Sequence, residues 1–159
     1  MCPSAQWAEY EFRFSGITDG DYTATGLIRY CVNPGGQQCA LNGEISVLYK
    51  GTLVSGMPVP LTVNPGCKAG KSYNNVIYDP PSSAIWGDPP VFTDGKGLQF
   101  NAGSYPNVRI YSAAPIISGQ ANYFIELVVS GSSKKRDNTV TILATGIGAP
   151  SVSLIVPTE

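Results

Sequence analysis

Apolar and polar residues alternate with a period of two through much of the chain, and this pattern constrains the fold more than any other feature. In the segment that begins at Tyr10, the apolar residues Phe12 and Phe14 fall on the same face of an extended chain as Tyr10, with Glu11 and Arg13 on the opposite face. Such alternation is typical of a β-strand with one buried face and one solvated face. No window has the spacing of an amphipathic helix. The sequence therefore predicts an all-β fold.

About ten segments have strand character and are separated by turn-forming residues. They are residues 10–15, 22–31, 41–49, 52–54, 76–78, 98–101, 107–111, 122–130, 139–145 and 152–156. Many short strands with turns between them favour antiparallel pairing over parallel βαβ units. We expect a single domain over residues 1–159, an antiparallel β-sandwich or jelly roll with one long proline-rich loop. Any oligomer would use the unpaired edge strands of its sheets.

The long loop falls between residues 64 and 95 and contains prolines 65, 80, 81, 89 and 90. Proline cannot donate a backbone hydrogen bond to a sheet, so regular strands are excluded from most of this stretch. Long ordered loops are uncommon in compact domains unless they serve a site. The loop is therefore the first place to look for function.

Within residues 67–92, aromatic side chains alternate with amides and carboxylates, a mixture that suits carbohydrate. Sugar rings stack on flat apolar faces, and their hydroxyls bond to planar polar groups. The candidate ligand-binding residues are Tyr73, Asn75, Tyr78, Asp79, Trp86 and Asp88, and the same loop also contains Asn74 and Phe92. The alternative is that these aromatic residues cover one edge of the fold.

The chain has no histidine, which excludes Ser-His-Asp and Cys-His catalysis and histidine-bound metals within one chain. Carboxylate chemistry remains, since glycoside cleavage needs two carboxyl groups about 5 to 9 Å apart. Sequence spacing selects no pair among the available residues, which are Glu9, Glu11, Glu44, Asp79, Asp88, Asp94 and Glu126. We expect no catalysis, no cofactor and no metal, with a carboxylate-dependent glycosidase as the remaining enzymatic alternative. The pair Asp19 and Asp21 is interpreted as part of a turn.

Charge and hydropathy restrict the partners. The net charge is −1 and only 13% of residues are charged, so no positive field is present to bind nucleic acid. The one basic run, residues 134–136, is interpreted as a hairpin tip. No apolar stretch reaches the roughly 18 residues of a membrane-spanning helix, and no signal peptide precedes Cys2. Either the chain is cytosolic or a leader has been removed.

The four cysteines favour removal of a leader. They form an even set without a Cys-x-x-Cys pair, which predicts two disulfides and a secreted, periplasmic or cell-surface protein. Cys31 and Cys39 bracket a turn-forming insert, so we favour a Cys31–Cys39 bond and a second bond between Cys2 and Cys67. The alternatives are four free thiols in a reducing cytosol, or an acylated Cys2 at the start of a lipoprotein.

Several short motifs resemble those of a known group of proteins. They are residues 10–16 (YEFRFSG), 74–78 (NNVIY), 94–100 (DGKGLQF) and 108–111 (VRIY). Over residues 10–128 the chain resembles exported bacterial proteins of the PEP-CTERM sorted kind. It departs from them in having no terminal hydrophobic sorting helix and basic tail, and Asn74 stands where those proteins often have aspartate. The resemblance implies an extracytoplasmic β-domain of the bacterial envelope, without an assigned activity.

These observations together predict an extracytoplasmic structural or interaction domain whose partner is a protein or a glycan at the cell surface. A carbohydrate-binding module that uses loop 67–92 is the main alternative. In that case Trp86, Tyr78 and Asp79 would be the distinguishing residues.

Overall fold

A computed structural model of the protein describes residues 7–15, 22–33, 35, 37–68, 73–79, 81–101, 106–115, 118–119, 121–130, 138–147 and 151–155. Within these residues the chain is mostly β-strand and contains no α-helix. The all-β prediction is therefore confirmed. The basic run at residues 134–136, the pair Asp19 and Asp21, and Cys2 lie outside the described residues.

Eleven strands are present among the described residues, against the ten expected. They are β1 (Trp7–Ser15), β2 (Tyr22–Cys31), β3 (Gln37–Tyr49), β4 (Thr52–Leu53), β5 (Val59–Pro60), β6 (Val76–Tyr78), β7 (Leu98–Asn101), β8 (Asn107–Ala113), β9 (Asn122–Ser130), β10 (Asn138–Ile147) and β11 (Ser151–Ile155). The additional strand is β5, a two-residue strand that ends in a proline and lacks a recognisable alternation.

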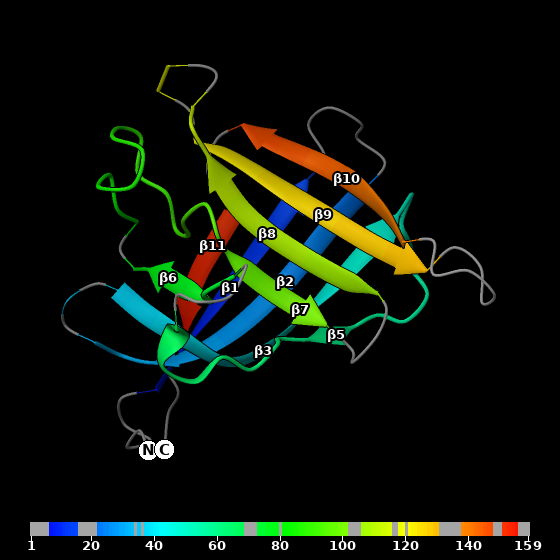
Figure 1. The fold of residues 1–159 in the computed structure, drawn as a ribbon, viewed down its shortest axis with the longest axis horizontal. Helices are drawn as coiled ribbons and strands as arrows, with labels where there is room; N and C mark the ends of the chain where they lie inside the picture. Colours follow the sequence, from blue (N-terminus) through cyan, green and yellow to red (C-terminus); the bar gives the residue numbers. More distant parts are fainter. Residues whose placement is uncertain are drawn as a thin grey trace.

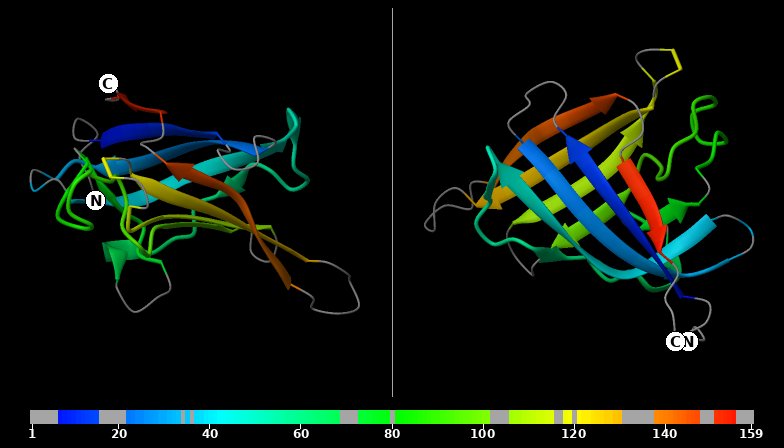
Figure 2. Two further views of the ribbon diagram at one scale, coloured as in Figure 1. Left: turned by 90° about the horizontal axis from the view of Figure 1, so that it is seen from above. Right: turned by 180° about the vertical axis from the view of Figure 1, so that it is seen from behind.

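The strands form two antiparallel sheets that lie one over the other, with their strands running in crossed directions (Figures 1 and 2). The larger sheet has the order β11-β1-β2-β3-β4, with β5 and β6 also paired to β3. The smaller sheet has the order β10-β9-β8-β7. Strand β3 is 13 residues long, and its outer edge is covered in turn by β6, β5 and β4.

A tight turn joins β3 to β4. Its two central residues, Lys50 and Gly51, have φ angles of 50° and 82°, and Leu48 and Tyr49 pair with Leu53 and Thr52 across it. Two-residue hairpin turns favour positive φ at both central positions because this matches the right-handed twist of the strands. Lysine at the first position is less usual, and the glycine that follows supplies the second positive φ without steric cost.

The core between the sheets is rich in aromatic side chains. Tyr10, Phe12 and Phe14 are all buried on the inner face of β1, as the alternation predicted. The ring of Phe92 lies among them, with centroids 5.8 Å from Tyr10, 5.6 Å from Phe12 and 5.1 Å from Tyr123 of β9. Phe92 belongs to the proline-rich loop, whose aromatic residues are predicted to lie at the surface of the fold. It is instead a core residue with 1% of its surface exposed.

The two sheets are joined along one side by residues 59–62. The backbone N–H of Leu61 donates to Gly43 O of β3 at 2.9 Å, and that of Thr62 donates to Gln99 O of β7 at 2.8 Å. Leu61 also forms an isolated bridge with Phe100 of β7. At their other ends the two sheets finish in β11 and β10. The edge of β7 is therefore already occupied. The other end of the smaller sheet is β10, and the two ends of the larger sheet are β11 and β4.

Candidate functional site

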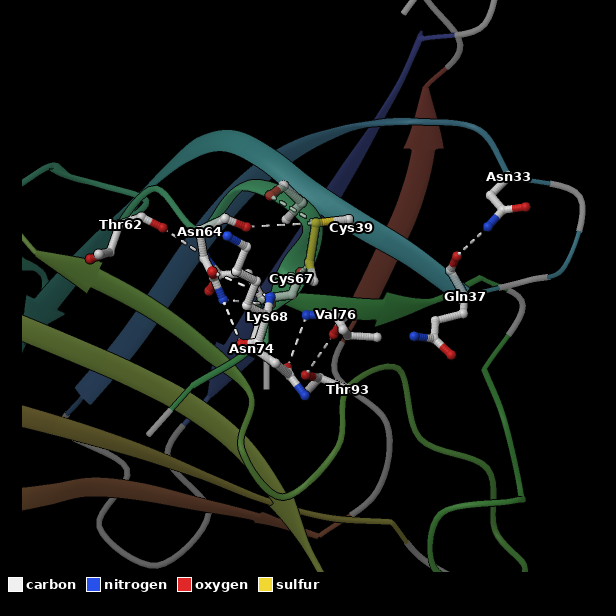
Figure 3. The surroundings of a disulfide bond; sticks show 12 residues. Asn33, Gln37, Cys39, Thr62, Asn64, Cys67, Lys68, Asn74, Val76 and Thr93 are labelled. Atoms are coloured by element: carbon white, nitrogen blue, oxygen red, sulfur yellow. Dashed lines mark hydrogen bonds between the residues drawn. A yellow bond between two sulfur atoms is a disulfide. The ribbon is translucent and has the colours of Figure 1, made fainter. Parts of the chain in front are cut away.

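The proline-rich loop is tied to the larger sheet at its start by a disulfide between Cys39 of β3 and Cys67 (Figure 3). The Cα atoms of the two residues are 5.7 Å apart. This corrects the expected pairing of Cys31 with Cys39 and of Cys2 with Cys67. Cys31 is also disulfide-bonded. Both cysteines that bracket the turn-forming insert therefore form disulfides, but not with each other. Strands β2 and β3 are already held together by their ladder, and the Cys39–Cys67 bond instead fastens the loop.

A buried asparagine shapes the backbone around this disulfide. The side-chain amide of Asn64 donates to the carbonyl oxygens of Lys68 at 3.2 Å and Asn74 at 3.3 Å, and its Oδ1 accepts from Lys68 N at 3.3 Å. Figure 3 shows Asn64, Lys68 and Asn74 grouped beside Cys67. Because these bonds satisfy buried backbone groups, Asn64 serves the fold of the loop rather than its surface.

Asn75 also has a structural role. It has a φ of 60° and is completely buried. Its Nδ2 donates to Thr62 O at 2.6 Å, and its Oδ1 accepts from Gln99 N at 3.0 Å. Asparagine tolerates the left-handed region better than most residues, and here its amide links residue 62 to β7. No part of Asn75 reaches the solvent, so its candidate role in ligand binding has no support from its position.

Tyr78 and Asp79 lie at the end of β6, next to the inner face of the larger sheet. Asp79 Oδ2 accepts a hydrogen bond from the hydroxyl of Tyr30 at 2.5 Å. Burial raises the pKa of the Tyr30 phenol, and the bond to Asp79 raises it further. Tyr78 is half-buried, and its pKa is raised by burial and by the charge of Asp94. The hydrogen bond from Tyr30 thus holds the half-buried Asp79 against the larger sheet.

Trp86 and Asp88 are the exposed members of the candidate set. Trp86 has 38% of its surface exposed, and its Nε1 donates to Ser112 Oγ of β8 at 2.8 Å. One edge of the indole lies against Gly95, where an added Cβ would be 3.3 Å from the ring. Asp88 is exposed and precedes the cis-proline Pro89. The loop thus presents a tryptophan whose orientation is set by a hydrogen bond.

The six candidate residues do not converge on one point. Trp86 and Asp88 belong to the exposed part of the loop, which is attached to the end of β8, while Asp79 faces Tyr30 of the larger sheet and Asn75 is in the interior. Tyr73 is half-buried where the described chain resumes after Lys68. The carboxylates are similarly dispersed, since Glu9 contacts Arg29 of the larger sheet and Glu126 lies in the smaller one.

The outer face of the smaller sheet carries a cluster of side chains that the sequence pattern did not predict. The rings of Tyr111 and Phe124 are stacked with centroids 5.4 Å apart, and the Arg109 guanidinium lies 4.3 Å from the Tyr111 centroid. The Tyr111 hydroxyl donates to Glu126 Oε1 at 2.6 Å. Alternation along β8 and β9 marks these positions as outward-facing, but only the register, which places Tyr111 opposite Phe124, brings them together. Because the Tyr111 ring contacts both Phe124 and Arg109, the side chains of this cluster pack against one another.

A hollow of about 310 Å³ lies beside the disulfide. It is lined by Cys31, Asn33, Gln37, Gln38, Cys39, Leu41, Gly66 and Val76. No charged side chain is among these residues, and Leu41 at its rim has 36% of its surface exposed. The hollow is separate from Trp86.

The tyrosines of the fold predict a dependence of stability on alkaline pH. Burial raises the pKa of Tyr123 to about 12, and burial with the bond to Glu126 raises that of Tyr111 to about 12, from a usual value of 10.0. A group that holds its proton more tightly when folded stabilises the fold below its unfolded pKa and loses that contribution as the pH rises toward its folded pKa. We therefore expect the free energy of unfolding contributed by these phenols to be constant below about pH 10 and to fall between about pH 10 and 12.

Denaturant unfolding at a series of pH values tests this expectation, with Tyr111→Phe as the comparison. The variant should lose stability less steeply above pH 10, because it releases one proton fewer on unfolding. Equal slopes for the wild type and the variant would contradict the assignment to Tyr111.

Comparison with known proteins finds no matching family model, no matching curated protein and no matching solved structure. None of the described residues belongs to a helix that is long and apolar enough to span a membrane. The geometry of the loop is therefore the basis for a functional proposal.

Proposed function

We propose that this chain is an extracytoplasmic β-sandwich domain that binds a partner through the exposed part of its proline-rich loop and performs no catalysis. The observation that carries the proposal is the way the loop is fixed. A disulfide joins Cys67 to Cys39, and a hydrogen bond joins Asp79 to Tyr30. Phe92 is buried in the core, whereas Trp86 is exposed. A loop held at several points loses little conformational freedom on binding, and this favours recognition.

Trp86 is the centre of the proposed contact surface. Tryptophan is enriched among the residues that contribute most to protein interfaces, because its large ring buries much surface for few rotatable bonds. The hydrogen bond from Nε1 to Ser112 satisfies its only donor and sets the ring orientation before binding. Asp88, two residues away and exposed, supplies an acceptor on the same part of the loop.

The extracytoplasmic location is supported by the disulfide, since such bonds persist in oxidising compartments. The resemblance to PEP-CTERM sorted proteins agrees with this location and suggests a bacterial envelope or secretome. Self-association would use an edge strand such as β10 or β11, each of which ends its sheet.

Replacing Trp86 by alanine should abolish partner binding while the protein remains folded. The oxidised protein would be incubated with proteins of the cell envelope, and bound species would be identified quantitatively by mass spectrometry. Tyr49→Ala is the matched control, because Tyr49 is an exposed aromatic residue at the far end of β3, with 41% of its surface exposed. We expect envelope proteins that bind to the wild type and to Tyr49→Ala but not to Trp86→Ala. Identical sets for all three proteins would overturn it.

Carbohydrate is the second candidate partner, and the exposed indole of Trp86 is the observation that favours it. Binding to a glycan array, with and without calcium, tests this alternative. Trp86→Phe keeps a flat ring but removes the bond to Ser112, so it should weaken binding, whereas Trp86→Ala should eliminate it. A glycan bound equally well by Trp86→Ala would place its site elsewhere on the protein.

A further inference from the structure

The hollow beside the disulfide has walls that the fold itself holds in place. One wall is the turn Pro65–Cys67, whose disulfide to Cys39 holds it against β3. Another is the turn after β2, where the side chain of Gln38 accepts from Asn33 N at 2.6 Å and donates to Asn33 O at 2.8 Å. The volume of about 310 Å³ falls within the range of small-molecule sites. Because its walls are already fixed, the hollow loses little conformational freedom when a ligand binds.

Gln37 provides the hollow with a polar group that the fold does not use. It is exposed and lines the hollow, and none of the described residues forms a hydrogen bond with its side-chain amide. The other two amides of the lining are occupied. Gln38 bonds to the backbone of Asn33, and the Asn33 side chain donates to Gln37 O and accepts from Gly35 N. A glutamine amide has a donor and an acceptor side by side, so Gln37 can bond to a ligand in both directions.

The rest of the lining is uncharged and partly apolar. No charged side chain lines the hollow, so a charged group of a ligand would lose hydration there without meeting an opposite charge. Leu41 and Val76 provide aliphatic surface, from β3 and from its partner strand β6 (Figure 3). Contact with such surface favours an apolar part of the ligand. These features select an uncharged ligand that has polar groups on one side and an apolar face on another.

We propose that this hollow binds an uncharged sugar ring. Two neighbouring hydroxyls of a sugar match the amide of Gln37, because one hydroxyl accepts from Nε2 while the next donates to Oε1. The C–H face of the ring is apolar and lies against Leu41 and Val76. A purely apolar ligand would instead bury the amide without a partner.

This site is independent of the contact surface around Trp86. None of its lining residues falls between positions 77 and 92 of the sequence. Gly66 is the part of the turn that lines the hollow, and a Cβ added there would meet no described atom within 4 Å. The turn therefore leaves the space beside it open, and the disulfide holds a wall of the site as well as the start of the proline-rich loop.

Titration of the isotope-labelled, oxidised protein with the methyl glycosides of glucose, galactose and mannose tests the proposal, with the backbone N–H signals followed by NMR. At least one of these sugars should shift the signals of Gln37, Leu41 and Gly66 in a saturable way. Gln37→Leu keeps a side chain of similar size but removes its hydrogen bonds, so it should weaken binding about tenfold or more. The absence of a saturable shift at these residues with all three sugars would overturn the proposal.

Two control variants separate this site from the rest of the surface. Gln99→Leu removes a half-buried glutamine from β7 of the smaller sheet and should bind the sugar as the wild type does. Trp86→Ala should also bind it with unchanged affinity, although it loses the envelope partner proposed above. Binding that is unchanged in Gln37→Leu, or that disappears in Trp86→Ala, would contradict a site at the hollow. Loss in Gln37→Leu with retention in Trp86→Ala would support it, whatever the envelope-protein experiment gives.

Discussion

The Phe92→Ala variant should lose about 3 to 5 kcal/mol of free energy of unfolding, the cost of removing a large aromatic side chain from a packed core. The ring of Phe92 contacts the rings of Tyr10, Phe12 and Tyr123, so its deletion leaves a cavity among three bulky neighbours that cannot easily close. The backbone N–H of Phe92 also donates to the Tyr123 hydroxyl at 3.1 Å. Denaturant-induced unfolding followed by circular dichroism measures the change.

Trp86→Ala is the appropriate comparison for Phe92→Ala, because both remove an aromatic ring from the same loop. Trp86 is partly exposed and Phe92 is buried, so Trp86→Ala should cost much less, about 1 kcal/mol, mainly through its hydrogen bond to Ser112. Phe92→Leu, which keeps an apolar side chain at the site, should fall between them. Similar losses for Phe92→Ala and Trp86→Ala would show that the loop does not contribute to the core as described.

Removal of the Cys39–Cys67 disulfide should cost about 3 to 4 kcal/mol. The bond closes a loop between residues separated by 28 positions, and a crosslink of this length removes conformational entropy mainly from the unfolded chain. The double variant Cys39→Ala/Cys67→Ala tests the effect without leaving a thiol that could exchange. Its midpoint of denaturation should fall, and its denaturant dependence should rise because the unfolded chain exposes more surface.

The same double variant distinguishes the role of the bond in stability from its role in the loop. If binding through Trp86 survives under conditions where the variant is still folded, the contacts of Asp79 and Phe92 are enough to position the loop. An unchanged midpoint would mean that the disulfide is not formed in the native protein, and this would also remove the basis for the extracytoplasmic assignment.

The local pattern predicted much of the fold. Burial of Tyr10, Phe12 and Phe14 follows from alternation alone, because successive side chains of a strand point to opposite faces. The expected strands have counterparts in the structure for the same reason. Strand β5 was not predicted because two residues are too few to show an alternation of period two. It forms because its backbone pairs with the edge of β3.

The details of the candidate site depended on pairings that a sequence does not display. Cys31 and Cys39 bracket a turn, and their separation of eight positions suggested a bond between them. The partner of Cys39 is instead set by the turn at Pro65–Cys67, which approaches β3 from a distant part of the chain. The aromatic residues of the loop likewise divide into a core residue, Phe92, and an exposed one, Trp86. Both are aromatic residues of the same loop, so the sequence does not distinguish them. Only the packing of the sheets shows which of the two is buried.

The position of β11 affects how this chain can fold during its synthesis. Strand β1 pairs with β2 on one side and with β11 on the other, where Glu9 is opposite Ile155. The ribosome therefore delivers the first partner of β1 directly after it, and the second only after strands β2 to β10 have been made. Until then β1 is an unprotected edge, open to wrong pairing or to a chaperone. The larger sheet is therefore completed only after β11 has been made, and a chain that ends before Ser151 would lack the strand that covers β1.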